Sequence, residues 1–95
     1  MYGDHSGEKS RFVSRLATLP KLKPIPAIGD WILVETDDPS ELARKVNRRL
    51  APGTISVPRQ MKGLVRIPVR EPIDNEKVFE VLKDVTKPPR KRYVS

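Results

Sequence analysis

The stretch WILVETDDPSELARKVNRRL, which occupies residues 31–50, decides the fold of this chain. It opens with a continuous run of aromatic, β-branched and apolar residues, which predicts a strand that ends at Glu35. Asp38 then suits the N-cap position of a helix, Pro39 suits the first helical position, and Glu41 completes a capping box. The stretch therefore predicts a strand that is followed directly by a helix.

The predicted helix runs from Pro39 to about Leu50 and has one apolar and one basic side. Its apolar stripe has helical spacing and consists of Leu42, Ala43, Val46 and Leu50. Its basic side chains face away from this stripe and are Arg44, Lys45, Arg48 and Arg49. We expect the apolar stripe to pack against a sheet, which leaves the basic side in solvent.

Two further strands are predicted over residues 54–59 and 64–70, and they form a hairpin. Alternation of side chains places the apolar residues of both strands on one face if Val57 lies opposite Ile67. This register leaves a three-residue loop that closes at Gly63. Such a loop requires a left-handed closing residue, so we expect a positive φ at Gly63.

A second helix is predicted from about Asn75 to Val85, with Asp74 as its cap and Pro88 preventing its continuation. Residues 91–94 are an optional edge strand. The elements then follow the order β-α-β-β-α. This order predicts a small α+β fold, a split βαβ or ferredoxin-like sandwich with its helices on one face of the sheet.

The N-terminal part, residues 1–29, is predicted to be an arm outside this sandwich. Phe12, Leu16 and Leu19 stand at helical spacing and predict a short helix, which needs a partner surface to form fully. Residues 21–29 follow Pro20, contain two further prolines and predict an extended linker. The expected division is an arm over 1–29, an α/β domain over 30–86 and a basic tail over 87–95.

Length and composition exclude several classes of protein. The chain has 95 residues and no cysteine, which excludes disulfides, thiolate zinc sites, iron–sulfur clusters and cysteine nucleophiles. A secreted domain of this size usually needs disulfides, so we expect an intracellular protein, cytoplasmic or nucleoid-associated. No apolar run approaches the ~20 residues of a membrane span, and we expect no membrane partner.

The sequence offers few residues for catalysis. His5 is the single histidine, and there is no nucleophile elbow, P-loop or dinucleotide-binding glycine motif. The pair Asp37-Asp38 is either a carboxylate pair or a turn that ends in the helix cap. We expect the second, and therefore no enzyme, catalytic residue, metal ligand, cofactor or small-molecule substrate.

Charge is the strongest functional signal in the sequence. The formal net charge is +7, of which residues 1–29 contribute +3 and residues 87–95 contribute +4. Residues 30–86 are neutral in sum but divided into blocks, and residues 42–70 carry eight bases without an acid. Such blocks predict a folded domain with a basic side that attracts anions.

The first functional hypothesis is a small basic protein that binds nucleic acid, DNA or RNA, through helix, hairpin and tails. Its candidate contacts are Arg44, Lys45, Arg48, Arg49, Arg59, Lys62, Arg66, Arg70, Lys87, Arg90, Lys91, Arg92 and Trp31. Two orientations of Trp31 are open. Either its indole lies beside Arg66 and Arg70 on the open sheet face as a stacking platform, or it fills the core and Ile32 and Val34 face outward.

The alternative hypothesis is a protein–protein adaptor or an assembly component, including a virion or ribonucleoprotein subunit. It would dock on its partner through the open sheet face and the apolar side of the N-terminal arm, Phe12, Leu16 and Leu19. The two hypotheses differ in salt dependence. Phosphate contacts weaken steeply with salt, whereas apolar docking tolerates it.

Overall fold

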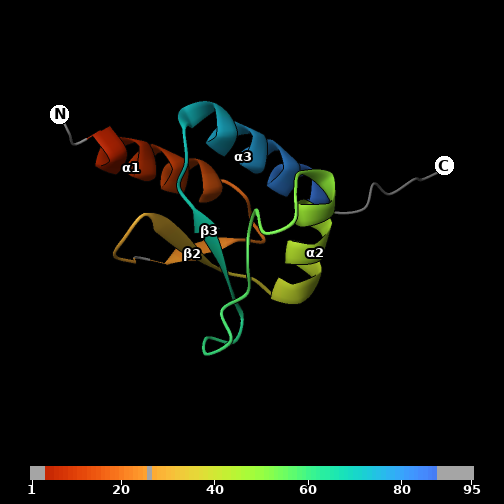
Figure 1. Cartoon of the computed structure of the whole chain (residues 1–95). Helices are drawn as coiled ribbons and strands as arrows, with labels where there is room; N and C mark the ends of the chain where they lie inside the picture. Colours follow the sequence, from red (N-terminus) through yellow and green to blue (C-terminus); the bar gives the residue numbers. More distant parts are fainter. Residues whose placement is uncertain (1–3, 26, 88–95) are drawn as a thin grey trace.

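The computed structural model describes residues 4–25 and 27–87, with side chains from Gly7 onward. It is an α+β fold of three helices and a three-stranded antiparallel sheet (Figure 1). The elements in chain order are α1 (Asp4–Leu16), β1 (Lys23–Ile25), β2 (Trp31–Glu35), α2 (Pro39–Arg49), β3 (Leu64–Pro68) and α3 (Pro72–Thr86).

The strand β2 is the centre of the sheet and pairs with β1 on one side and with β3 on the other. Burial alternates along it: Ile32 and Val34 are buried, whereas Trp31 and Glu35 are exposed. Val34 lies opposite Val65 of β3, which is also fully buried. This alternation gives the sheet one apolar face that needs a cover and one face turned outward.

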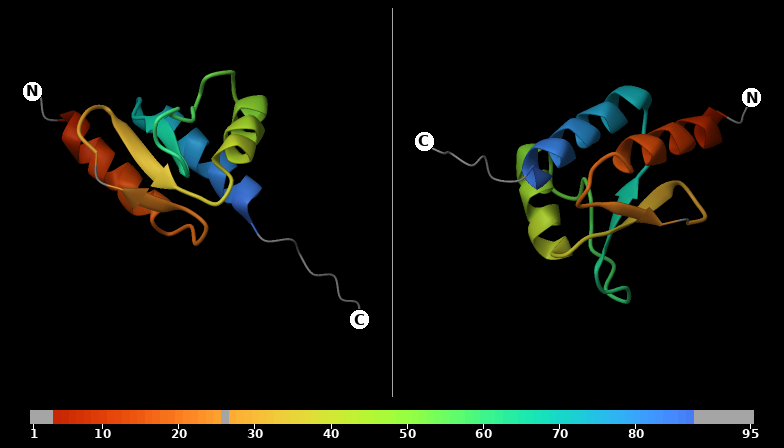
Figure 2. Two further views of the ribbon diagram at one scale, coloured as in Figure 1. Left: turned by 90° about the horizontal axis from the view of Figure 1, so that it is seen from below. Right: turned by 180° about the vertical axis from the view of Figure 1, so that it is seen from behind.

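The helices cover the apolar face of the sheet (Figures 1 and 2). The helices α1 and α3 lie side by side over it, and α2 packs against α3 and β3. The shared core contains Phe12 and Leu16 of α1, Val46 of α2 and Leu82 of α3. No helix covers the opposite face of the sheet within the described part of the chain.

The strand–helix stretch forms as predicted. The Oδ1 atom of Asp38 accepts a hydrogen bond from the backbone N–H of Glu41 at 3.2 Å, so Asp38 is the N-cap. Pro39 occupies the first turn, where its missing N–H costs no helical hydrogen bond. Leu42, Ala43 and Val46 are buried as expected.

The N-terminal part is not an arm but a piece of the same fold. Phe12, Leu16, Leu19 and Leu22 are all buried in the core that the rest of the chain forms. The predicted linker contains β1, which pairs with β2 as an edge strand. Proline in β1 removes a donor that an edge strand does not need, and for this reason the strand tolerates it.

The third helix begins three residues earlier than predicted. It starts at Pro72, with Glu71 as a cap residue whose side chain makes no capping hydrogen bond. Asp74 is an acid in the first turn and not the cap. Asn75 is a buried residue whose side chain accepts from the N–H of Arg70 and donates to its carbonyl, both at 2.8 Å. These two hydrogen bonds hold the segment that leads into α3. The sequence does not reveal them.

The predicted hairpin is only partly formed. Residues 54–59 make no strand; Ser56 alone bridges Arg66, with backbone hydrogen bonds of 3.0 and 2.7 Å. This pairing lies two residues from the predicted register, and an even shift leaves every side chain on its expected face. Gly63 has a φ of +82°, as expected.

The sheet therefore differs from the predicted sandwich at both edges. At one edge lies β1, from a segment in which no strand was predicted, and at the other the predicted strand over residues 54–59 is reduced to the Ser56–Arg66 bridge. The optional edge strand over 91–94 lies outside the described residues.

Candidate nucleic-acid interface

The face of the sheet opposite the helices carries one aromatic side chain, two cations, one acid and several apolar side chains. We call this surface the open face. The registers of the three strands place eight residues on this side: Lys23, Ile25, Trp31, Leu33, Glu35, Leu64, Arg66 and Pro68. Lys23, Trp31, Glu35 and Arg66 are exposed.

The indole of Trp31 faces outward, as the first of the two predicted orientations requires. The side chain is 38% exposed, while its neighbour Ile32 is 1% exposed. The ring lies against Gly29, whose φ is +110° and where an added Cβ would approach ring atoms to 2.9 Å. The guanidinium carbon of Arg66 lies 5.4 Å from the ring centroid. Gly29 thus leaves room for the indole, and the guanidinium of Arg66 lies near the ring.

Four basic residues lie at the start of β1 and in the connection that leads into β3. Lys21 and Lys23 line a shallow pocket of about 250 Å³ together with Gly63. Lys62 precedes that glycine, and Arg59 lies in the same connection, which extends past the sheet (Figure 1). We call Lys21, Lys23, Arg59 and Lys62 the basic end of the sheet.

All four side chains of the basic end are exposed. None of them forms an ion pair with an acid of the described residues, and neither does Arg66. Acids are also nearby, because Glu35 lies opposite Lys23 and Asp37 lines the same shallow pocket. Lys21 also lines a second hollow together with Asp37, Asp38 and Glu41.

The basic side of α2 is largely compensated by acids. The carboxylate of Glu41 accepts from Arg44 at 2.6 Å and lies 3.7 Å from Lys45. Arg49 donates to Asp84 of α3 at 2.8 Å. The hydrogen bonds from these arginines lower the pKa of Glu41 and of Asp84, so both acids stay charged.

Arg48 is the exception on α2. It is exposed and forms no ion pair among residues 4–25 and 27–87.

Arg70 does not lie on the open face, contrary to the prediction. The strand β3 ends at Pro68, and the chain then turns toward α3. The guanidinium of Arg70 donates to the carbonyl of Thr54 at 3.0 Å and is half-buried. This arginine has a structural role in joining two connections, and it is not available to phosphates.

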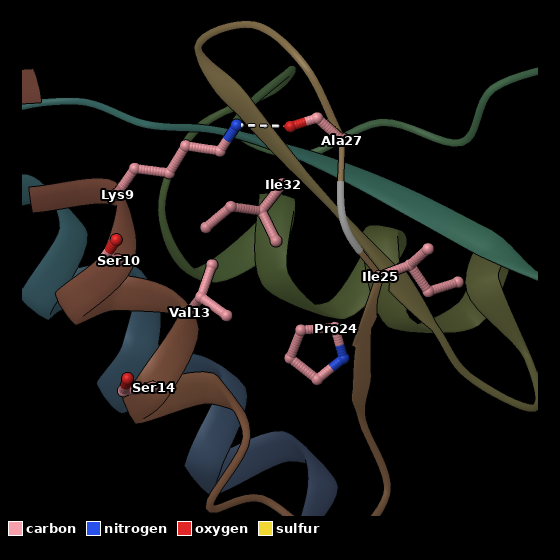
Figure 3. A pocket seen from close by; sticks show the side chains of 8 residues that line it. All are labelled: Lys9, Ser10, Val13, Ser14, Pro24, Ile25, Ala27 and Ile32. Carbon is pink, nitrogen blue, oxygen red and sulfur yellow. Dashed lines mark hydrogen bonds between the residues drawn. The ribbon is translucent and has the colours of Figure 1, made fainter. Parts of the chain in front are cut away.

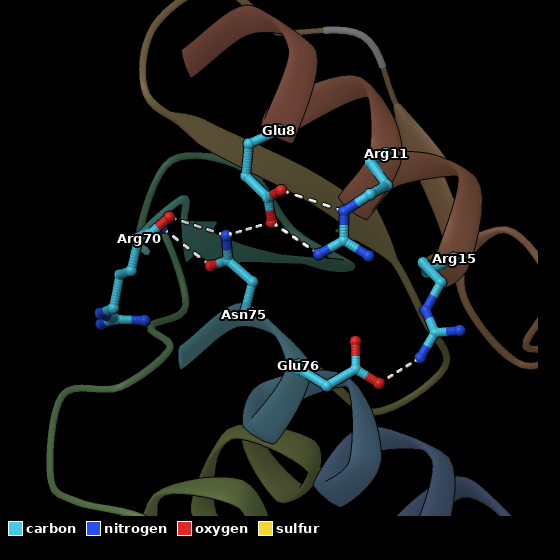
Figure 4. Close-up of polar contacts among 6 residues, drawn as sticks. All are labelled: Glu8, Arg11, Arg15, Arg70, Asn75 and Glu76. Atoms are coloured by element: carbon cyan, nitrogen blue, oxygen red, sulfur yellow. Dashed lines mark hydrogen bonds and ion pairs between the residues drawn. The ribbon is translucent and has the colours of Figure 1, made fainter. Parts of the chain in front are cut away.

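Three bases of α1 also have structural partners. Lys9 donates to the carbonyl of Ala27 at 2.6 Å (Figure 3) and to that of Gly29 at 2.7 Å, which ties α1 to the β1–β2 connection. Arg11 pairs with Glu8, which also accepts from Asn75 (Figure 4). These two donors lower the pKa of Glu8.

The third is Arg15, which pairs with Glu76 of α3 (Figure 4). Its guanidinium carbon lies 4.2 Å from the centroid of the Phe79 ring. The positive charge of α1 is therefore used within the fold, and only Lys21 and Lys23 of the predicted arm face solvent without such partners among the described residues.

The alternative docking residues are not accessible. Phe12, Leu16 and Leu19 are at most 7% exposed, because they fill the core of this chain. A partner would have to displace that core to reach them. In the basic tail, Lys87 is exposed, while Arg90, Lys91 and Arg92 lie outside the described residues.

Another hollow is a groove of about 480 Å³ between α1 and β1. Among the described residues that line it, the one charged group is Lys9, whose Nζ already donates to two carbonyls (Figure 3). Across the described ranges, no three acids, histidines or cysteines come together in a metal-binding group. No helix there has the length and apolar character to cross a membrane.

In comparisons with known proteins, no family model matches the chain, and no curated protein matches it significantly. The site therefore rests on its own geometry. Sequence analysis missed Lys21 and Lys23 as members because it assigned them to a linker. The alternation of polar and apolar residues in KLKPI, residues 21–25, was the available signal for a strand, since Leu22 is buried between two exposed lysines.

Proposed function

We propose that this protein binds nucleic acid and contacts phosphates with the basic end of the sheet and Arg66. The observation that carries the proposal is the presence of five exposed cations on β1, β3 and the segments that lead into them, none of which forms an ion pair among the described residues. Clustered lysines and arginines displace counterions from a phosphate backbone, and this release requires no particular base sequence.

Further contacts in this proposal are Arg48 and the basic tail from Lys87 to Arg92. The bases of α2 that pair with Glu41 and Asp84 contribute less, because their acids repel phosphates at the same place. The proposal places the protein inside the cell, in the cytoplasm or with the nucleoid, where nucleic acids are found.

Fluorescence anisotropy of labelled oligonucleotides at several salt concentrations tests this function. Five phosphate contacts predict that log affinity falls against log salt with a slope of about −3.5 on a single strand or about −4.5 on duplex DNA. Absence of binding to duplex and single strand at low salt overturns the proposal.

A second candidate function is docking of a protein partner on the open face. It is favoured by exposed apolar side chains, namely Trp31 on this face at 38% exposure, and Ile28 at 92% and Met61 at 44% in the connections that precede β2 and β3. Such a complex would bury apolar area and persist at high salt, which distinguishes it from phosphate binding.

We also propose that the sheet contains a split βαβ unit, in which β2 and the segment around Ser56 flank β3 and α2 is the crossover. The Ser56–Arg66 bridge supports this topology. Amide exchange tests it: the N–H groups of Ser56 and Arg66 should be protected to a similar degree. Rapid exchange at Ser56 alone would reduce the unit to β2, α2 and β3.

A further inference from the structure

We infer that the nucleic acid is a single strand that lies along the open face with one base stacked on Trp31. The inference deepens the proposed function and rests on it. Trp31 stands at one end of β2 and the basic end lies at the other, with Arg66 between them on the neighbouring strand. A stacking group and phosphate contacts are thus arranged along one line.

The dimensions of the face fit a short segment of single strand. Trp31 and Glu35 are four residue steps apart in β2, which is about 13 Å at 3.3 Å per step. Stacked bases rise about 3.4 Å each, so this length corresponds to about four stacked nucleotides, and to fewer when the bases are splayed apart. A base on Trp31 therefore leaves the next few phosphates within the span that ends at the basic end.

The position of the indole favours an unpaired base over a duplex. The face of a base is accessible to a side chain only when the base is unstacked, and an aromatic ring on an open sheet is a common platform for such bases. A duplex keeps its bases stacked and offers groove edges and phosphates instead. Trp31, half-covered by Gly29 and flanked by Arg66, has no role in that geometry.

The charge distribution supports the same ligand. The basic side of α2, which is the helix that a major groove would receive, has its cations paired with Glu41 and Asp84. Among the described residues, five exposed cations without an ion pair lie at the sheet, and four lie on or just after the helices: Arg48, Lys77, Lys83 and Lys87. A single strand along the open face can reach the five at the sheet.

Stacking on an indole tolerates every base, because each base has a π-face. The second planar group, the guanidinium of Arg66, can stack as well as bind phosphate. We therefore assign the site to single strands with little sequence preference.

The sole tryptophan of the chain makes the test direct. An unlabelled eight-nucleotide thymidine or uridine oligonucleotide is titrated at low salt while the fluorescence of Trp31 is recorded. The same protein is then titrated with a duplex of equal charge. We expect tighter binding of the single strand and quenching of Trp31 by it.

Two substitutions locate the stacking contact, with a labelled single strand as the probe. Trp31→Ala should lower the affinity about tenfold or more, as is usual for one stacked base, while Trp31→Phe should retain most of it. Circular dichroism of both variants controls for folding. If Trp31→Ala does not fold, Trp31→Phe and the fluorescence of the intact chain decide.

Equal or tighter binding of the duplex overturns the inference, as does unchanged Trp31 fluorescence at saturation with the single strand. In both cases the proposed function survives, since phosphates are still bound. Failure of the function itself has a different signature, which is absence of binding to both probes at low salt.

Discussion

The basic end of the sheet and the basic side of α2 have similar charge in the sequence, but they differ in their neighbours. The cations of α2 meet acids: Glu41 one turn earlier and Asp84 from α3. Those of the basic end lack such partners among the described residues, although Glu35 is close. A count of bases along a chain is thus a poor measure of a binding surface, because the fold decides which of them are compensated.

The largest expected effect on nucleic-acid affinity comes from removing charge at the basic end of the sheet. The double variant Arg59→Gln/Lys62→Gln should lose about tenfold or more in affinity for a single strand at low salt. The salt slope should fall by about 1.4, since two phosphate contacts are lost. Anisotropy titrations measure both quantities.

The matched control is Arg44→Gln/Lys45→Gln, which removes the same charge from α2. It should change the slope by less than half as much, because Glu41 already offsets these two bases. Equal changes in the salt slope for the two double variants would contradict the proposed difference between the basic end of the sheet and α2.

A second effect concerns the backbone that supports the basic end. Gly63→Val should destabilise the fold by about 1–2 kcal/mol, because a β-branched residue resists a φ of +82°. A urea titration followed by circular dichroism gives the free energy of unfolding. Unchanged stability would mean that the connection adopts another backbone conformation in solution.

A smaller effect is expected at the start of α2. Asp38→Ala removes the cap hydrogen bond to Glu41 and should cost about 1 kcal/mol in the free energy of unfolding. Nucleic-acid affinity should stay the same once the variant is fully folded. A loss of affinity in the folded variant would assign Asp38 a role beyond the cap.

The smallest effects on affinity are expected from neutralising one acid in each of the two regions. Asp84→Asn releases Arg49 on α2 and should raise the affinity for a single strand by less than threefold. Glu35→Gln at the basic end should raise it more, since Glu35 lies opposite Lys23 on the proposed path of the strand. The reverse order of the two gains would favour α2 as the phosphate surface.

Low pH should break the ion pairs of Glu41 and Asp84 without a mutation, because it protonates their carboxylates. The pKa values of Glu41 and Asp84 are lowered in the folded protein, so their ion pairs stabilise the fold above the ordinary carboxylate pKa of about 4. This contribution is lost as the pH falls below 4 through the lowered values. The stability of Glu41→Gln should therefore depend less on pH in that window than the stability of the unmutated chain, as thermal melts at pH 3 and pH 6 will measure.

The strand–helix stretch was predictable because its signals are local. A run of apolar residues, a cap at Asp38 and a proline at the next position act within a few residues of one another. The strand β1 was not predictable in the same way, since its pairing with β2 joins Lys23 to Glu35 across a turn rich in proline and glycine. The start of α3 depends on Asn75, whose bonds form only in the folded chain.

The candidate site shows the same division. Face alternation allowed two orientations of Trp31, and burial of Ile32 and Val34 under the helices selects the outward one. Arg49 forms an ion pair with Asp84 of α3, and no local sequence pattern predicts this contact. Long-range packing, rather than composition, determines which bases belong to the interface.

The most direct test of the central claim is a map of amide chemical-shift changes during titration with a short single-stranded oligonucleotide at low salt. The account predicts that the largest changes fall on β2, on β3 and on residues 58–63, with Trp31, Gly63 and Arg66 among them. It also predicts small changes along α2. Changes concentrated on α2, or no changes at a saturating oligonucleotide concentration, would contradict it.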